Sequence, residues 1–126
     1  MPSETLGLLL ISGGHERAHY AFVLAAGAAA IGRKVVLFAT NEGCRALLAG
    51  AADRLDPVRD TAIRARGIAG IGELREAAAE LGVRMIACEA GLRIAGLETE
   101  ILANGVERAG VATFLEAARG GQLLSL

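Results

Sequence analysis

Three short, unbroken apolar runs constrain the fold of this chain more than any other feature. They are Leu6–Ile11, Val35–Ala39 and Met85–Ala87, the last within a predicted strand at residues 83–87, and segments of helical character separate them. A strand with one face in water alternates apolar and polar side chains, whereas a strand covered on both faces is apolar throughout. The chain therefore predicts an α/β fold built on a parallel sheet.

The first predicted helix, from about Glu16 to Ile31, is apolar nearly all round. A helix of this kind must be covered on more than its sheet-facing side. The chain as a whole is 53% hydrophobic, which is high for 126 residues. We therefore expect the excess apolar surface to form a subunit interface and the protein to be a homo-oligomer.

Shorter elements complete a single domain over residues 1–126. Residues 72–81 carry apolar side chains at helical spacing, which predicts an amphipathic helix. Residues 50–70 mix Arg and Asp without an apolar period, so we expect a solvated loop or flap there. Further short helices are predicted at 45–49, 89–95, 97–103 and 114–119, and further strands at 106–108 and 122–126.

Charge and composition exclude several classes of function. The net charge is −1, with one Tyr, three Phe and no Trp, so the basic face and stacking aromatics of a nucleic-acid binder are missing. The longest uncharged run, residues 18–32, is too short and too rich in Ala and Gly for a membrane span. The first apolar run lacks the basic segment of a secretory signal, and the two cysteines have no disulfide-type spacing. We expect a cytoplasmic protein without nucleic acid or membrane partners.

Metal, cofactor and hydrolase motifs are also missing. His15 and His19 are spaced i, i+4, but no third ligand completes a zinc motif. The Gly13-Gly14 turn lacks both the G-x-G-x-x-G pattern and a Walker lysine, so a tight strand-to-helix turn explains it. No G-x-S-x-G elbow occurs. We therefore expect neither a metal nor a cofactor.

Thiol chemistry remains, and Cys88 is the candidate nucleophile. It follows a predicted strand and precedes a predicted helix, a position where the thiolate is favoured and where α/β proteins often place reactive groups. Glu89 is adjacent and opposes thiolate formation. Cys44 also follows a predicted strand, so a parallel sheet brings both cysteines to one edge. A structural, buried cysteine remains the alternative at both positions.

Several segments resemble a known family. They are the glycine turn after the first strand, the helix leading into Gly82–Cys88, then Ile94–Leu97 and Gly105–Leu115. Together they resemble the DsrE/DsrF-like proteins, in particular the branch labelled peroxiredoxin-like, although the peroxidatic P-x-x-x-T-x-x-C pattern is absent. The resemblance implies a three-layer α/β/α fold with a parallel five-stranded sheet, assembled as a dimer, trimer or hexamer. It also implies that Cys88 carries sulfane sulfur as a persulfide.

Two hypotheses for the function remain at this point. In the first, Cys88 takes sulfur from a donor protein and passes it to a partner thiol, with a bordering group of residues shielding or orienting the persulfide. In the second, the chain is a non-enzymatic oligomeric binding or regulatory module with a structural Cys88 and a small-ligand cleft at the strand edge. The bordering residues proposed for the first are Gly13, Gly14, His15, Asn41, Cys44 and Glu89.

Overall fold

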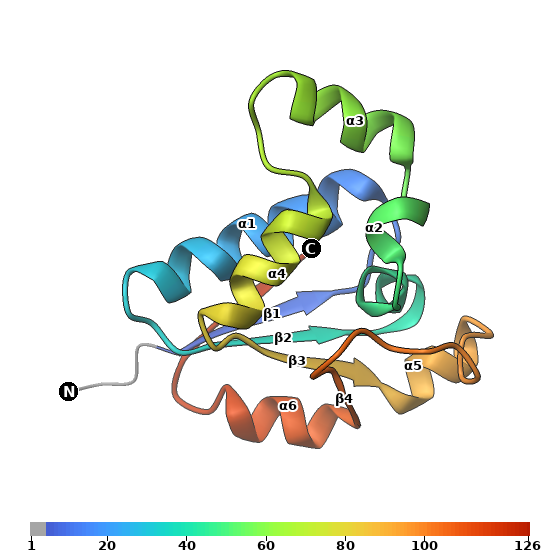
Figure 1. Cartoon of the computed structure of the whole chain (residues 1–126). Helices are drawn as coiled ribbons and strands as arrows, with labels where there is room; N and C mark the ends of the chain where they lie inside the picture. The colour runs from blue at the N-terminus through green and yellow to red at the C-terminus, as the bar shows by residue number, and fades with distance from the viewer. Residues whose placement is uncertain (1–4) are drawn as a thin grey trace.

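A computed structural model describes residues 5–126, apart from the side chains of Ala52 and Asp53. Strands and helices alternate along most of the chain (Figure 1). The strands are β1 (Leu6–Leu10), β2 (Val35–Ala39), β3 (Arg84–Cys88), β4 (Glu107–Ala109) and β5 (Gln122–Ser125). The helices are α1 (His15–Ala30), the 3-10 helix η1 (Asn41–Leu47), α2 (Ala51–Arg54), α3 (Pro57–Ala65), α4 (Ile71–Glu80), α5 (Glu89–Ile94) and α6 (Val111–Ala117).

The five strands form one parallel sheet in the order β4-β3-β2-β1-β5. The three apolar runs supply its three central strands, because only these are covered on both faces. The short polar β4 and the exposed β5 take the two edges. Since all strands run the same way, their carboxyl ends meet at a single edge of the sheet. The predicted α/β fold with a parallel five-stranded sheet is confirmed.

Helices cover both faces of the sheet (Figure 1). Helices α1 and α4 lie side by side on one face, over inward side chains such as Leu8 and Leu37. Helix α6 lies on the other face, where Phe114 stacks on Phe38 with ring centroids 4.9 Å apart. Alternate residues of one strand thus enter two separate apolar cores, as the two-residue period of a strand requires.

The all-round apolar character of α1 has an explanation inside one subunit. Ala18, Phe22 and Ala25 are fully buried, and the helix contacts both the sheet and α4. Cover on two sides needs a wider apolar surface than a single stripe. The subunit interface expected on α1 therefore remains a prediction, for which the exposed Tyr20 of this helix and Ile31 at its C-cap are the large apolar side chains in water.

The prediction of a loop or flap at residues 50–70 is wrong, because two helices form there. Asp56 caps α3 by accepting the Arg59 backbone N–H at 3.1 Å, and Pro57 occupies the first helical position. These residues are a standard helix-start signal. The apolar period is missing because α3 buries a carboxylate, Asp60, in place of an apolar stripe.

The short helix predicted at residues 97–103 is also wrong. The segment is a turn followed by an isolated antiparallel bridge between Leu102 and Leu48. Ala103 donates its backbone N–H to Leu47 at 2.9 Å, and Ala49 donates to Ile101 at 2.8 Å. Backbone pairing with a distant segment therefore replaces the local helical bonds.

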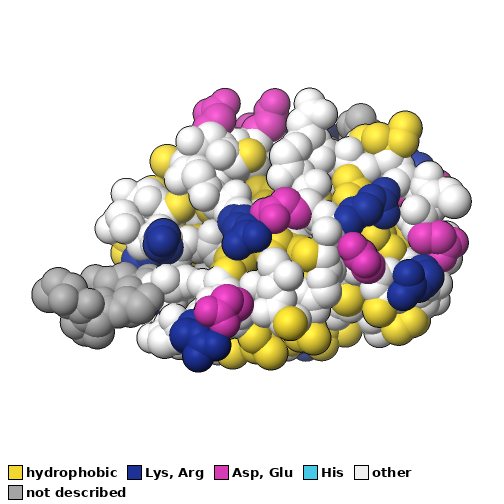
Figure 2. Space-filling view, turned by 90° about the horizontal axis from the view of Figure 1, so that it is seen from below, with side chains coloured by type: hydrophobic (Ala, Val, Ile, Leu, Met, Phe, Trp, Pro, Cys, Tyr) yellow, Lys and Arg dark blue, Asp and Glu magenta, His cyan; other side chains and the backbone are white. Residues whose placement is uncertain are grey.

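The α6 side of the molecule carries exposed apolar side chains. Figure 2 looks onto this side and shows hydrophobic patches between pairs of oppositely charged side chains. Val111, Leu115 and Leu123 each lie about half exposed there. Within residues 5–126, no helix is both long and apolar enough to cross a bilayer.

Candidate functional site at the carboxyl edge of the sheet

Cys88 lies at the carboxyl end of β3 and is the N-cap residue of α5. Its Sγ accepts the backbone N–H of Gly91 at 3.3 Å. The residue is 8% exposed, so the thiol lies just beneath the surface. The Gly91 N–H therefore fixes the position of the Cys88 sulfur and can serve as its hydrogen-bond donor during a reaction.

The position of Gly91 depends on close packing between α5 and the end of β2. A Cβ atom built on Gly91 would collide with the Thr40 side chain and with the Asn41 backbone nitrogen. Asn41 begins η1 with a positive φ of 54°, and the Thr40 hydroxyl donates to its Oδ1 at 3.0 Å. Only glycine lets the α5 backbone approach this closely. The donor to Cys88 is therefore fixed by the turn after β2, which contains the predicted site residue Asn41.

Cys44 lies in the middle of η1 and is fully buried. Its Sγ donates to the carbonyl of Ala39 at 3.4 Å. The pKa of Cys44 is raised to about 11, mainly by burial, with smaller contributions from the charges of Cys88 and Glu42. The two cysteines therefore meet at one edge, as predicted, but in different states of burial and hydrogen bonding.

Gly13 joins the loop after β1 to the same edge. A Cβ atom on Gly13 would approach the Glu42 Cβ to 2.8 Å, so this loop packs directly on η1. Gly14 is the N-cap of α1, and its backbone N–H donates to the Ser12 hydroxyl at 3.1 Å. The loops after β1, β2 and β3 thus form one continuous surface.

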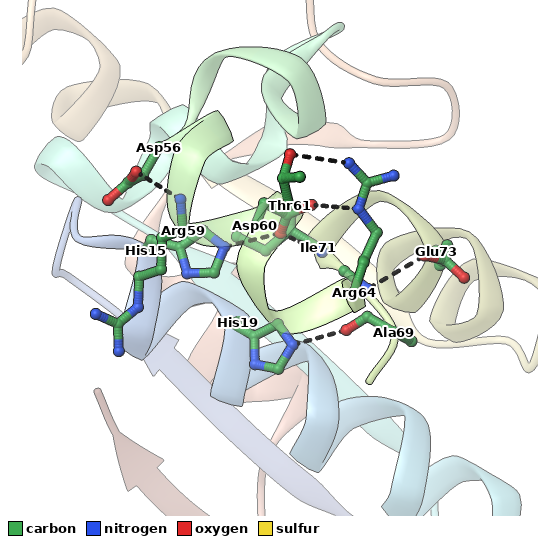
Figure 3. Close-up of polar contacts among 11 residues, drawn as sticks. His15, His19, Asp56, Arg59, Asp60, Thr61, Arg64, Ala69, Ile71 and Glu73 are labelled. Atoms are coloured by element: carbon green, nitrogen blue, oxygen red, sulfur yellow. Dashed lines mark hydrogen bonds and ion pairs between the residues drawn. The ribbon is translucent and has the colours of Figure 1, made fainter. Parts of the chain in front are cut away.

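His15 belongs to a different cluster, drawn in Figure 3. Its Nε2 bonds to the Asp60 carboxylate of α3 at 2.8 Å, and both side chains are buried. The ring stacks on His19, whose Nε2 bonds to the carbonyl of Ala69 at 2.8 Å. The hydrogen bond between His15 and Asp60 joins α1 to α3. Within the described residues, the His15 ring makes no hydrogen bond to Cys88.

Glu89, the remaining predicted residue, is the first residue of α5 and is exposed. Its carboxylate follows the thiol directly in the chain, where water screens much of its charge. No three His, Cys, Asp or Glu side chains gather as a metal site in the described part of the chain. The arrangement supports nucleophilic attack by a thiolate that is held by an amide.

Comparison with known proteins identifies the family. The model of the DsrE/DsrF/DrsH-like family matches residues 52–124, more than half of the chain. The chain belongs to this family. The sulfur carrier protein DsrE2 of Allochromatium vinosum is 27% identical, over 94% of both chains. The crystal structure of the ychN protein from E. coli is similar with a TM-score of 0.73 at 17% identity, over 98% of this chain and 99% of that one.

These matches confirm the resemblance and the fold expected for a DsrE/DsrF/DrsH-like chain. Sequence reasoning missed Gly91 and Asp60, which hold the two clusters together. Gly91 could have been found as the third residue after a cysteine N-cap, where a capping side chain accepts its hydrogen bond. Asp60 could have been suspected from the Asp56-Pro57 helix start, although its histidine partner lies 45 residues away.

Proposed function

We propose that this protein is a sulfur-relay protein that carries sulfane sulfur as a persulfide on Cys88 and passes it to a partner thiol. The observation that carries the proposal is the Gly91 N–H on the Cys88 sulfur, in a chain with a relative described as a sulfur carrier. An amide donor at this place gives the sulfur a hydrogen-bond partner during the transfer.

The transfer involves two thiol-exchange steps without net oxidation. The Cys88 thiolate attacks the outer sulfur of a donor persulfide, an S–S bond to Cys88 forms, and the donor leaves as a thiolate. An acceptor thiolate then attacks the outer sulfur on Cys88, and the Cys88 thiolate is the leaving group. The Gly91 N–H stabilises that leaving thiolate in the second step and the attacking one in the first.

For this function we propose that the chain binds a sulfur donor protein, a sulfur acceptor protein and further copies of itself. We propose that a donor places its persulfide at the carboxyl edge of the sheet, where Cys88 is 8% exposed. We propose the reducing cytoplasm as the compartment because both cysteines are free thiols. A homo-oligomer remains our expectation, with exposed Val111, Leu115 and Leu123 as a candidate contact surface.

The proposal is tested by loading the reduced protein with inorganic polysulfide and measuring its intact mass. We expect the natural chain and Cys44→Ser to gain sulfur that dithiothreitol removes, and Cys88→Ser to gain none. Cyanide should release the bound sulfur as thiocyanate, which identifies it as sulfane sulfur. Cys44→Ser is the matched control because it removes the other thiol of the same edge.

Two results would overturn the sulfur-relay function. One is a Cys88→Ser variant that takes up as much sulfur as the natural chain. The other is a folded natural chain that takes up none, which leaves the binding or regulatory module with a structural Cys88 as the function to pursue.

A further inference from the structure

The turn that leads from β2 into η1 is unusual at two successive residues. Thr40 is the N-cap residue of η1, where a threonine hydroxyl ordinarily accepts a backbone N–H of the helix. Here it makes no capping bond and donates instead to Oδ1 of Asn41 at 3.0 Å. Asn41 itself has a positive φ of 54°, which is uncommon outside glycine. Such departures persist where the surrounding structure requires them, and they cluster at functional sites.

Both residues face helix α5. The Thr40 hydroxyl and the Asn41 backbone nitrogen lie where a Cβ atom on Gly91 would be placed. Gly91 is buried, and its N–H donates to Sγ of Cys88 at 3.3 Å. Direct contacts therefore connect the Thr40 hydroxyl to Gly91 and Gly91 to the Cys88 sulfur.

The other side of this turn is attached to the end of β1. Thr40 donates its backbone N–H to the Leu10 carbonyl at 3.0 Å, and Gly43 donates to the Ile11 carbonyl at 2.9 Å. A Cβ atom on Gly43 would collide with the Leu10 carbonyl, so the two backbones also touch. The turn is held by a central strand and is a fixed support for Gly91.

We infer that the Thr40 hydroxyl, oriented by the Asn41 side chain, is a positioning group that keeps the Gly91 N–H directed at the Cys88 sulfur during sulfur transfer. This inference rests on the proposed function of Cys88. It gives Asn41, one of the residues expected to border the persulfide, an indirect role that acts through the Gly91 amide.

The chemistry of the two side chains suits this role. A hydroxyl oxygen is smaller than a methyl group, so it fits against Gly91 where a methyl group would crowd the backbone. The bond to Asn41 keeps the Thr40 hydroxyl from turning towards the N–H groups of η1. Asparagine is one of the few residues that adopt a left-handed backbone and also offer a side-chain acceptor.

The test measures hydrogen exchange of the Gly91 amide by NMR in the natural chain, Thr40→Ser, Thr40→Val and Asn41→Gly. Serine keeps the hydroxyl and valine replaces it with a methyl group. Glycine keeps the left-handed backbone without the side-chain acceptor. We expect exchange on the order of fivefold faster in Thr40→Val and Asn41→Gly, because the support of one hydrogen bond is lost, and the natural rate in Thr40→Ser.

The Leu97 amide is the internal control, because it donates to the Leu92 carbonyl of α5 at 2.7 Å. A general loosening of α5 accelerates both amides, whereas loss of positioning accelerates the Gly91 amide alone. Three results would overturn the inference. They are an unchanged Gly91 amide in either Thr40→Val or Asn41→Gly, equal acceleration of the two amides, and a serine variant as impaired as the valine variant.

A second measurement connects the Gly91 amide to sulfur transfer. Each protein is loaded with polysulfide, and the release of its sulfur to cyanide is followed as thiocyanate. The Gly91 N–H is the hydrogen-bond donor to the leaving Cys88 sulfur, so we expect Thr40→Val and Asn41→Gly to release it on the order of fivefold more slowly per loaded thiol.

The outcomes of this second measurement separate the positioning role from the function itself. Release at the natural rate in the valine and glycine variants would overturn the role in transfer. A natural chain that loads no sulfur would contradict the proposed function of Cys88 instead. Hydrogen exchange needs no persulfide, so it reports on the support of the Gly91 amide in either case.

Discussion

The edge around Cys88 and the α3 arm, defined as residues 56–70, are attached to the same α/β body by opposite means. At the edge, backbones meet so closely that Gly13 and Gly91 have no space for a side chain, and the polar groups there include a neutral thiol. On the arm, the single buried residue of α3 is the carboxylate of Asp60, held by His15 and the Ile71 backbone N–H.

This difference in chemistry produces a difference in what each region tolerates. Close backbone packing is insensitive to acid but cannot accept one additional methyl group. A buried, hydrogen-bonded carboxylate accepts changes of shape around it, but its contribution to stability depends on its own ionisation. The edge is therefore suited to hold a reactive sulfur in fixed geometry, and the arm is the part whose attachment responds to acid.

Removal of the Asp60 carboxylate should have the largest effect on stability. Asp60→Ala leaves the Ile71 N–H and His15 without their buried acceptor, and we expect the free energy of unfolding in urea to fall by about 3 kcal/mol. The control is Glu16→Gln, which breaks the exposed Arg59–Glu16 pair and should cost a few tenths of a kcal/mol. Equal losses in the two variants would show that the arm is not held by its buried pair.

A methyl group at Gly91 should have the next largest effect. Gly91→Ala places a Cβ against Thr40 and Asn41, and we expect a loss of roughly 2 kcal/mol from overpacking. The matched control is Gly27→Ala in α1, where nothing lies within 4 Å of the new atom. This substitution should stabilise the protein by about 0.5 kcal/mol, since alanine favours a helix. A tolerated Gly91→Ala would contradict the close packing of the edge.

The two regions should respond to opposite ends of the pH scale, with smaller effects. Burial would raise the pKa of Asp60, but the bonds from His15 and Ile71 and the charge of Arg64 outweigh it and lower the pKa. Its stabilisation is then present above the pKa of an unfolded Asp, about 4, and is lost as the pH falls below that. Cys44 has a raised pKa, so its stabilisation is lost as the pH rises from 9.0 towards about 11, by about 1 kcal/mol at pH 10.

To test this, the free energy of unfolding is measured as a function of pH for the natural chain and for one variant of each region. Asp60→Asn should flatten the acid side and leave the alkaline side unchanged. Cys44→Ser should flatten the alkaline side alone. A variant that changes both sides, or neither, would contradict the separation of the two regions.

The sequence predicted the parts of the molecule that depend on local patterns. The apolar runs identified β1, β2 and β3 because a strand covered on both faces needs apolar residues throughout. The position of Cys88 at the end of one run followed directly, as did the placement of Cys44 at the same edge of the sheet. The helix α3 was missed because its one buried side chain is charged, so no hydrophobic period reveals it.

By itself, therefore, the sequence determined the α/β class, the family and the choice of Cys88 as the candidate thiol. All three follow from local patterns within short stretches of the chain. Only the tertiary structure decided how distant stretches meet. It placed β5 beside β1, His15 against Asp60, and Gly91 against the turn after β2. Each of these contacts joins residues far apart in sequence, and hydrogen bonds between single distant groups leave no period or motif in the sequence from which they could be read.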